Sequence, residues 1–198
     1  IPGKRLITEL PFGVPHALEF GVTATLHPAG HILGSAQILL ESAEHGSLLY
    51  TGDFKLRPGL AAEPCATPRA DVLIMETTYG KPHYLLPPTA EVLADIIRFC
   101  RNALSEHETP VLFGYSLGKS QEILASLASA GLPVMLHPAT LRLTRVYEKL
   151  GITFDALNRD AFTRQRRLIQ GGLGGEQDTV HGNEFAWLHH DNVAYSEL

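Results

Sequence analysis

The second half of this 198-residue chain alternates short apolar runs with longer amphipathic stretches, and this alternation limits the folds open to it. The runs 110–113 and 133–136 have the length of buried strands. Apolar residues recur at helical spacing from Pro87 onward, over about four turns, and again over 117–130 and 141–150. Such alternation predicts an α/β fold whose parallel sheet is covered by helices, with active groups at the carboxyl ends of the strands.

The first eighty residues instead predict strands joined by tight turns. Residues 22–26 and 36–40 are rich in alternating or β-branched residues, and 47–51 is expected to pair with 36–40 across the turn at 44–46. Residues 71–75 form a continuous apolar run, which predicts a strand buried on both faces.

Composition excludes some classes of protein. The net charge of −5 argues against a chain coated in positive potential, although a local basic groove is compatible with it. No apolar run approaches membrane-spanning length, so we expect no membrane partner. Cys65 and Cys100 are too few for a disulfide scaffold and predict buried thiols in a reducing, cytoplasmic setting. The chain begins at Ile1 without a signal peptide, which favours a processed product or a fragment.

Four side chains that suit metal or acid–base chemistry share one kind of position. His31, Asp53, Glu76 and His137 each follow an apolar strand. Imidazole and carboxylate groups are ligands for divalent metals such as zinc. Taken singly, Asp53 also fits a loop-stabilising turn, and His137 fits the cap of the helix that Pro138 opens.

The motifs around these residues resemble a known family. Residues 27–37 (HPAGHILGSAQ), 51–55 (TGDFK) and 75–80 (METTYG) look like successive motifs of the metallo-β-lactamase superfamily in its β-CASP nuclease branch. Residues 115–121 (YSLGKSQ) and the Pro87-Pro88 helix entrance are most similar to the bacterial DNA ligase-associated exonuclease group.

The resemblance extends over roughly residues 20 to 155 and implies a domain organisation. Residues 1–82 would form the C-terminal part of a metallo-β-lactamase sandwich sheet, and 83–158 an inserted β-CASP-like parallel α/β domain. Residues 159–198 would form a basic, Gly-rich tail that returns toward the first domain.

The resemblance also assigns roles to single residues. It makes His31 a metal ligand and Asp53 the carboxylate that bridges two divalent metal ions, zinc or alternatively manganese. Glu76 would support the metal-site histidines or the nucleophilic water, and His137 would contact the scissile phosphate or the leaving group. His190 is the candidate for the family's last metal-binding histidine.

One expected motif is missing. The superfamily's first ligand motif, His-x-His-x-Asp-His, occurs nowhere in these 198 residues. Most metal ligands are therefore absent, and the sequence predicts a fragment that is inactive without the rest of its parent.

A second signal lies at the start of the helix predicted from residue 117. Ser116, Gly118 and Lys119 follow a strand and open this helix, a setting in which backbone amides and a lysine bind phosphate. The spacing differs from that of a nucleotide-binding P-loop, because only three residues separate Gly114 from Gly118 where that motif has four. Capping of the helix by Ser116 is the alternative.

The favoured function is therefore a metal-dependent nuclease that hydrolyses phosphodiester bonds, as a DNA exonuclease in repair. DNA is favoured over RNA as the partner, and a DNA ligase or helicase is a candidate protein partner. The alternatives are a non-catalytic nucleic-acid-binding module of the same fold and, less favoured, a P-loop-like nucleotide hydrolase.

Overall fold

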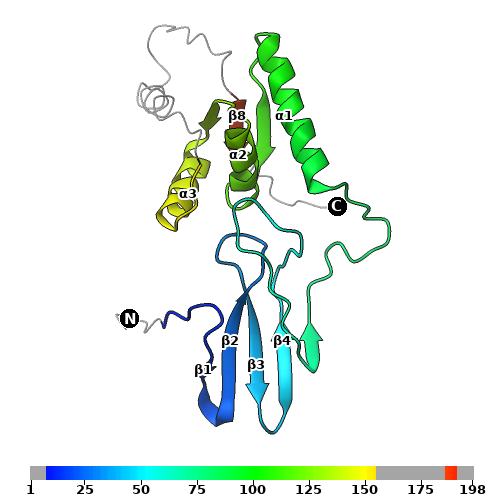
Figure 1. Ribbon diagram of the computed structural model, residues 1–198, viewed down its shortest axis with the longest axis vertical. Helices are drawn as coiled ribbons and strands as arrows, with labels where there is room; N and C mark the ends of the chain where they lie inside the picture. Colours follow the sequence, from blue (N-terminus) through cyan, green and yellow to red (C-terminus); the bar gives the residue numbers. More distant parts are fainter. Residues whose placement is uncertain (1–7, 155–185, 191–198) are drawn as a thin grey trace, which may run out of the picture. The chain divides into compact units, whose positions relative to one another are not determined.

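The chain divides into two compact units, an N-terminal unit of Ile1–Tyr84 and a C-terminal unit of Leu85–Leu198 (Figure 1). The computed structural model describes residues 8–154 and the backbone of residues 186–190. In the part of the chain that the structure describes, the fold is α/β, with a mixed sheet in the N-terminal unit and three helices in the C-terminal unit. The two units are described separately below.

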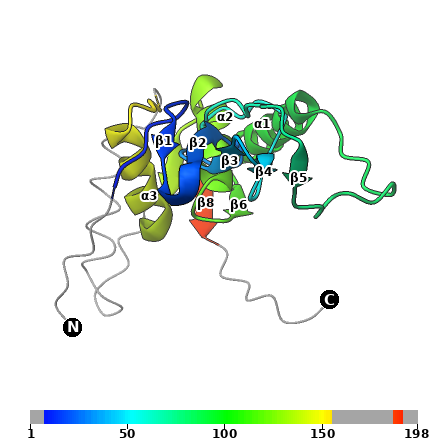
Figure 2. The ribbon, with the colours of Figure 1, turned by 90° about the horizontal axis from the view of Figure 1, so that it is seen from below.

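A five-stranded sheet in the order β1-β2-β3-β4-β5 forms the N-terminal unit, as Figure 2 shows. The strands are β1 (His16–Ala17), β2 (Val22–Pro28), β3 (Ala36–Ser42), β4 (Gly46–Tyr50) and β5 (Val72–Ile74), and a short 3-10 turn (Glu19–Gly21) precedes β2. Because β2 and β4 both pair antiparallel with β3, and β5 pairs parallel with β4, the carboxyl ends of β2, β4 and β5 lie at the same end of the sheet.

The pairing of β3 with β4 confirms the predicted hairpin. Gly46 starts β4 with a φ of +78°, a conformation that glycine adopts without steric cost. The start of β5 is fixed beside β4 by Asp71, whose carboxylate accepts hydrogen bonds from the amide and the hydroxyl of Ser47, each at 2.8 Å. The Ser47 hydroxyl and then its amide hold the pKa of Asp71 below its ordinary value.

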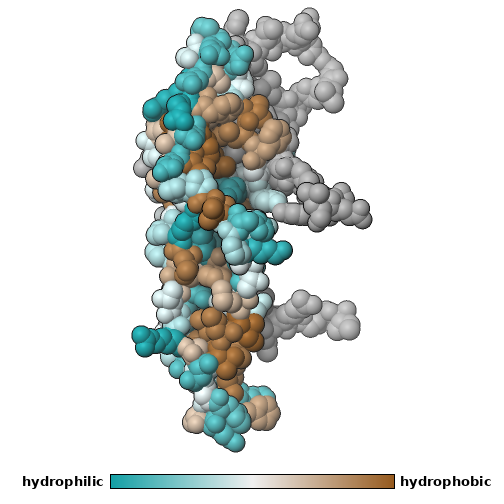
Figure 3. Space-filling model, turned by 90° about the vertical axis from the view of Figure 1, so that its right-hand side faces the viewer, coloured by the Kyte–Doolittle hydropathy of each residue, from teal (hydrophilic) through white to brown (hydrophobic). Residues whose placement is uncertain are grey.

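The prediction that residues 71–75 form a strand buried on both faces is wrong. Among the described residues, β5 is an edge strand that pairs only with β4, and Val72, Leu73 and Ile74 are all about half exposed. Figure 3 views the side of the molecule on which β5 lies and shows hydrophobic patches there among hydrophilic atoms. An apolar run by itself therefore did not distinguish an edge strand from a central one.

A three-stranded parallel sheet forms the centre of the C-terminal unit, in the order β6-β8-β7. Its strands are β6 (Val111–Gly114), β7 (Val134–Leu136) and β8 (Ala186–His190), and its helices are α1 (Thr89–Ser105), α2 (Lys119–Ser129) and α3 (Pro138–Lys149). These elements match the predicted alternation closely. Residues 186–190, which lie in the predicted tail of residues 159–198, pair with β6 and β7.

The helices cover the sheet of the C-terminal unit and bury an apolar core. α2 packs against β7, α3 against β8, and α1 against α2. The fully buried side chains include Leu124 and Leu127 of α2 and Leu136 of β7. The prediction that residues 110–113 form a buried strand holds only in part, because Phe113 is 65% exposed.

Both cysteines are free thiols, and burial raises the pKa of each. Cys100 is buried, as predicted, whereas Cys65 is only partly buried. Among the helices within the described ranges, none combines the length and the apolar character that crossing a bilayer requires.

Candidate active site

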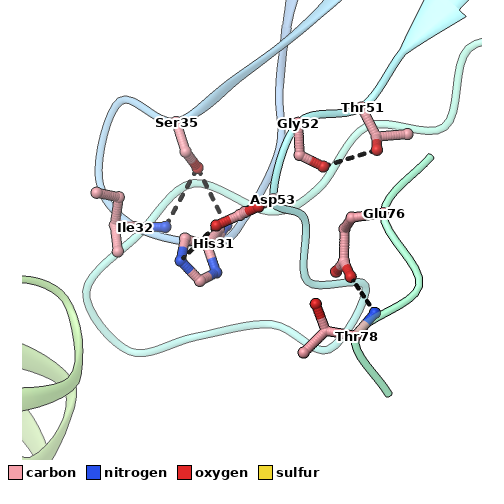
Figure 4. A network of polar contacts seen from close by, with 8 residues as sticks. All are labelled: His31, Ile32, Ser35, Thr51, Gly52, Asp53, Glu76 and Thr78. Atoms are coloured by element: carbon pink, nitrogen blue, oxygen red, sulfur yellow. Dashed lines mark hydrogen bonds and ion pairs between the residues drawn. The ribbon is translucent and has the colours of Figure 1, made fainter. Parts of the chain in front are cut away.

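Three of the predicted site residues lie on neighbouring loops at one end of the N-terminal sheet (Figure 4). His31 follows β2, Asp53 follows β4 and Glu76 follows β5. The strand directions bring these three loops together, as the predicted placement at strand ends requires.

The backbone of the His31 loop is held by two features of its own sequence. Gly30 has a φ of +70°, and a Cβ at this position would lie 2.6 Å from the carbonyl oxygen of Lys55. Only glycine allows this close approach. The hydroxyl of Ser35 accepts hydrogen bonds from the amides of His31, at 3.1 Å, and Ile32, at 3.2 Å.

Gln37 ties the His31 loop to the long loop that follows β4. Its side chain is 3% exposed, and its Nε2 donates to the carbonyl of Pro28 at 3.0 Å and to that of Ala66 at 2.7 Å. Backbone bonds strengthen this connection, because the amide of Ala66 donates to Pro28 and the amide of Lys55 donates to Ala29, each at 2.9 Å. Gln37 lies in the motif of residues 27–37, but the motif alone did not predict this role.

The imidazole of His31 and the carboxylate of Asp53 face one another. Nε2 of His31 lies 3.9 Å from Oδ2 of Asp53, and the two side chains are 48% and 76% exposed. Ligand bonds to zinc are about 2.0–2.2 Å long, so two atoms bound to one ion lie within about 4.4 Å of each other. The pair therefore fits two ligands of a single divalent ion, in donor type and in spacing.

The carboxylate of Glu76 is held by the residues that follow it. Its Oε2 accepts a hydrogen bond of 2.7 Å from the amide of Thr78. The amide and then the hydroxyl of Thr78 lower the pKa of Glu76, and the charge of nearby His31 and the amide of Phe54 lower it further. Glu76 is therefore a preformed carboxylate acceptor beside His31.

Within the described ranges, His31 and Asp53 do not have enough further candidate ligands around them to form a complete metal site. No group of three or more His, Cys, Asp and Glu side chains that could hold a metal ion occurs there. A catalytic zinc site uses three protein ligands and a water, so at least one further protein ligand has to come from elsewhere. His190 ends β8, but its side chain lies outside the described part of the structure.

His137 lies in the C-terminal unit, where it caps α3. Its Nδ1 accepts a hydrogen bond of 3.3 Å from the amide of Ala139, as the capping interpretation expects. In the neutral imidazole, this arrangement places the proton on Nε2 and makes that atom a donor. Capping and a catalytic role therefore use different ring nitrogens.

The backbone amides of the loop before α2 donate hydrogen bonds to groups within the loop and the first turn of that helix. Gly118 is the N-cap of α2, in place of Ser116, and its amide donates to Oε1 of buried Gln121 at 2.7 Å. The amides of Lys119 and Ser120 also bond within this loop. Of the predicted phosphate-binding groups, the exposed ammonium of Lys119 is then the one best placed to meet a ligand.

Three known proteins are similar to most of this chain. A probable DNA ligase of Opitutus terrae is 63% identical over 154 residues, which are 78% of this chain and 15% of that protein. The 5′ exonuclease Apollo of Gallus gallus is 36% identical over 146 residues, 73% of this chain and 31% of that protein. Transcription termination factor FttA of Methanocaldococcus jannaschii is 32% identical over 121 residues, 60% of this chain and 19% of that protein.

No family model matches the chain. The chain spans less than a third of the length of each of these three relatives. The relatives nevertheless include an exonuclease. The similarity to these relatives agrees with the resemblance of the chain's motifs to the β-CASP branch of the metallo-β-lactamase superfamily.

Proposed function

We propose that this chain supplies His31, Asp53 and Glu76 to the active site of a metal-dependent nuclease that hydrolyses phosphodiester bonds. The observation that carries the proposal is the 3.9 Å separation of His31 Nε2 and Asp53 Oδ2 at the end of the sheet where Glu76 also lies. The 5′ exonuclease among the relatives favours strand ends as the substrate, and the relative named as a probable DNA ligase favours DNA, with repair as the proposed setting. The free thiols suit a reducing compartment, which favours the cytoplasm.

His31 and Asp53 would hold a divalent ion, and a second ion would bind at the same site, as the resemblance implies. Zinc fits this donor set best, and manganese is the alternative. When bound, the ions would polarise the scissile phosphate and make water a strong nucleophile at neutral pH. The completed site, with ligands from outside this pair, would resemble the metal centre of a metallo-β-lactamase sandwich.

Glu76 would orient the attacking water. Its lowered pKa keeps the carboxylate ionised at neutral pH, so that it accepts a hydrogen bond rather than donating one. His137 would donate from Nε2 to the departing oxygen, since its Nδ1 already accepts from Ala139.

The experiment that tests the proposal is a nuclease assay of the complete gene product. Asp53→Asn should abolish cleavage of 5′- or 3′-labelled DNA and lower the bound zinc measured by elemental analysis, because one ligand loses its charge. Glu44→Gln, an exposed carboxylate in the β3–β4 turn, is the control and should leave both unchanged. A wild-type protein that binds no metal and cuts neither DNA nor RNA would refute the proposal.

A non-catalytic nucleic-acid-binding module is the second candidate. It is favoured by one observation, the lack of a third metal-binding side chain beside His31 and Asp53 in the described ranges. In that case the complete gene product would bind single strands in a salt-dependent way and leave them intact in zinc and in manganese.

A further inference from the structure

The loop that leaves the candidate site carries a cluster of aromatic rings. Tyr79 is the third residue after Glu76. Its ring contacts that of Tyr84 edge to face, with the ring centroids 5.3 Å apart. The ring of His83 lies 4.2 Å from that of Tyr84. We call Tyr79, His83 and Tyr84 the aromatic cluster.

The backbone of this loop is ordered by two successive turns. The amide of Gly80 donates to Thr77 at 2.9 Å, and the amide of Tyr84 donates to Lys81 at 3.1 Å. The first turn begins directly after Glu76, so Tyr79 lies within about 11 Å of Glu76 along the chain. The cluster is thus tied to the candidate site by short, hydrogen-bonded backbone.

The cluster stays open to solvent although its rings contact each other. Tyr79 is 64% exposed and Tyr84 is 43% exposed, and His83 is exposed as well. Rings that served only to pack the loop would bury their faces. Exposed aromatic faces next to a hydrolytic site are surfaces on which a planar group can stack.

The chemistry around the cluster favours a nucleobase as that group. Lys81 is exposed between Tyr79 and His83 in the sequence and supplies a positive charge for a phosphate, which an acidic chain must provide locally. Aromatic rings interleaved with a basic side chain are the usual combination for single-stranded nucleic acid. Bases of a duplex are already stacked on one another, so the ligand must be a single strand or an unpaired end.

We propose that the aromatic cluster and Lys81 form a stacking platform that binds the bases of single-stranded nucleic acid next to the candidate active site. The platform deepens the nuclease proposal and rests on it for the class of ligand. It would accept any base, because stacking reads no hydrogen-bond pattern, and it would hold a strand beside Glu76.

The test compares two probes of equal charge, an oligothymidylate of about 10 nucleotides and an abasic oligomer of the same length, binding to the full chain in EDTA. The intact oligomer should bind more tightly. Tyr79→Ala and Tyr84→Ala should each weaken its binding by roughly 5- to 150-fold without affecting the abasic oligomer. Tyr84→Phe should restore the affinity, because phenylalanine stacks as well. Oligouridylate should show the same pattern, since the sugar does not contribute to stacking.

Phe20→Ala is the matched control, because Phe20 is an aromatic residue that is 95% exposed and precedes β2 at the other end of the sheet. It should leave all affinities unchanged. Equal binding of the intact and abasic oligomers, absence of binding, or an equal loss for both probes in the tyrosine variants would each overturn the platform. Base-dependent binding without any metal-dependent cleavage by the complete gene product would support the platform and overturn the nuclease proposal instead.

Discussion

Gln37 reaches across to Ala66, and its side-chain amide donates to the carbonyl there at 2.7 Å. The same nitrogen donates to Pro28 at 3.0 Å, so one buried side chain fastens the loop that carries His31 to a segment far along the sequence. Gln37→Met keeps the length of the side chain and removes both bonds. It should lower the free energy of unfolding by about 1–3 kcal/mol, because the carbonyl of Ala66 loses its amide donor and the carbonyl of Pro28 keeps only the amide of Ala66.

Urea denaturation followed by circular dichroism measures this loss. Glu41→Met is the control, since Glu41 is exposed on the same strand and its replacement should change the free energy by no more than about 0.5 kcal/mol. An equal effect of the two substitutions would show that Gln37 contributes no bond of its own.

Alanine substitutions at Gly30 and Gly34 distinguish the cost of backbone strain from the cost of steric overlap. Both have positive φ, of +70° and +76°, but a Cβ on Gly34 would meet no atom within 4 Å, whereas one on Gly30 would lie 2.9 Å from Cβ of Cys65. Gly34→Ala should therefore cost about 1 kcal/mol of stability, and Gly30→Ala at least about 3 kcal/mol. Thermal unfolding of the two variants checks the order, which similar losses would contradict.

The pH dependence of stability should carry a contribution from Glu76. Its folded pKa is lowered from the ordinary value of 4.5, so it stabilises the fold fully above that value, and this stabilisation is lost as the pH falls through the folded pKa. Glu76→Gln should therefore flatten the loss of stability below about pH 4.5 in urea titrations.

Two further variants sharpen this test. Thr78→Val should flatten the same loss only in part, because the Thr78 amide, the larger influence on Glu76, is retained. Ser47→Ala should instead act on the contribution of Asp71, whose pKa Ser47 lowers from an ordinary value of 3.8. If Glu76→Gln loses stability at acid pH as steeply as the wild type does, the bond between Thr78 and Glu76 would be contradicted.

Gln121 plays a comparable role in the C-terminal unit. It is fully buried, accepts from the amide of Gly118, and donates to the carbonyl of Ser116 at 3.0 Å and to the hydroxyl of Thr144 at 3.1 Å. Gln121→Leu should cost about 2–4 kcal/mol of unfolding free energy, because the amide of Gly118 and the carbonyl of Ser116 both lose their bond to this side chain. Thr144→Val, which removes one of these bonds, should cost about 1 kcal/mol. The reverse order in chemical denaturation would argue against this network.

Local sequence signals predicted most of the elements. Residues 36–40 and 47–51 pair as expected, because a short turn containing Gly46 joins two strands of matching pattern. The helices of the C-terminal unit were visible in their apolar spacing, and Pro138 indeed opens α3.

Features that depend on distant partners were not predictable in the same way. The exposure of Val72 depends on the position of β5 at the sheet edge, which an apolar run does not encode. The role of Gln37 depends on Ala66, 29 residues away. The contact between Thr78 and Glu76 is local, and the short spacing of the two residues was a signal that could have revealed it.

The candidate site shows the same division. The motifs around His31 and Asp53 singled out two candidate metal ligands, and the structure brings their side-chain atoms within 3.9 Å. The assignment of Ser116 as a possible helix cap failed, because the positive φ of Gly118 and the reach of Gln121 provide that cap instead.

The direction of the strands has a practical consequence. The turn at residues 43–45 is exposed and lies at the end of the sheet opposite the loops of His31, Asp53 and Glu76. Exposed loop tips tolerate added groups. A fluorophore or a surface tether attached at His45 would therefore leave the other end of the sheet accessible. Single-molecule recordings could then follow the binding and release of a nucleic-acid strand at that end.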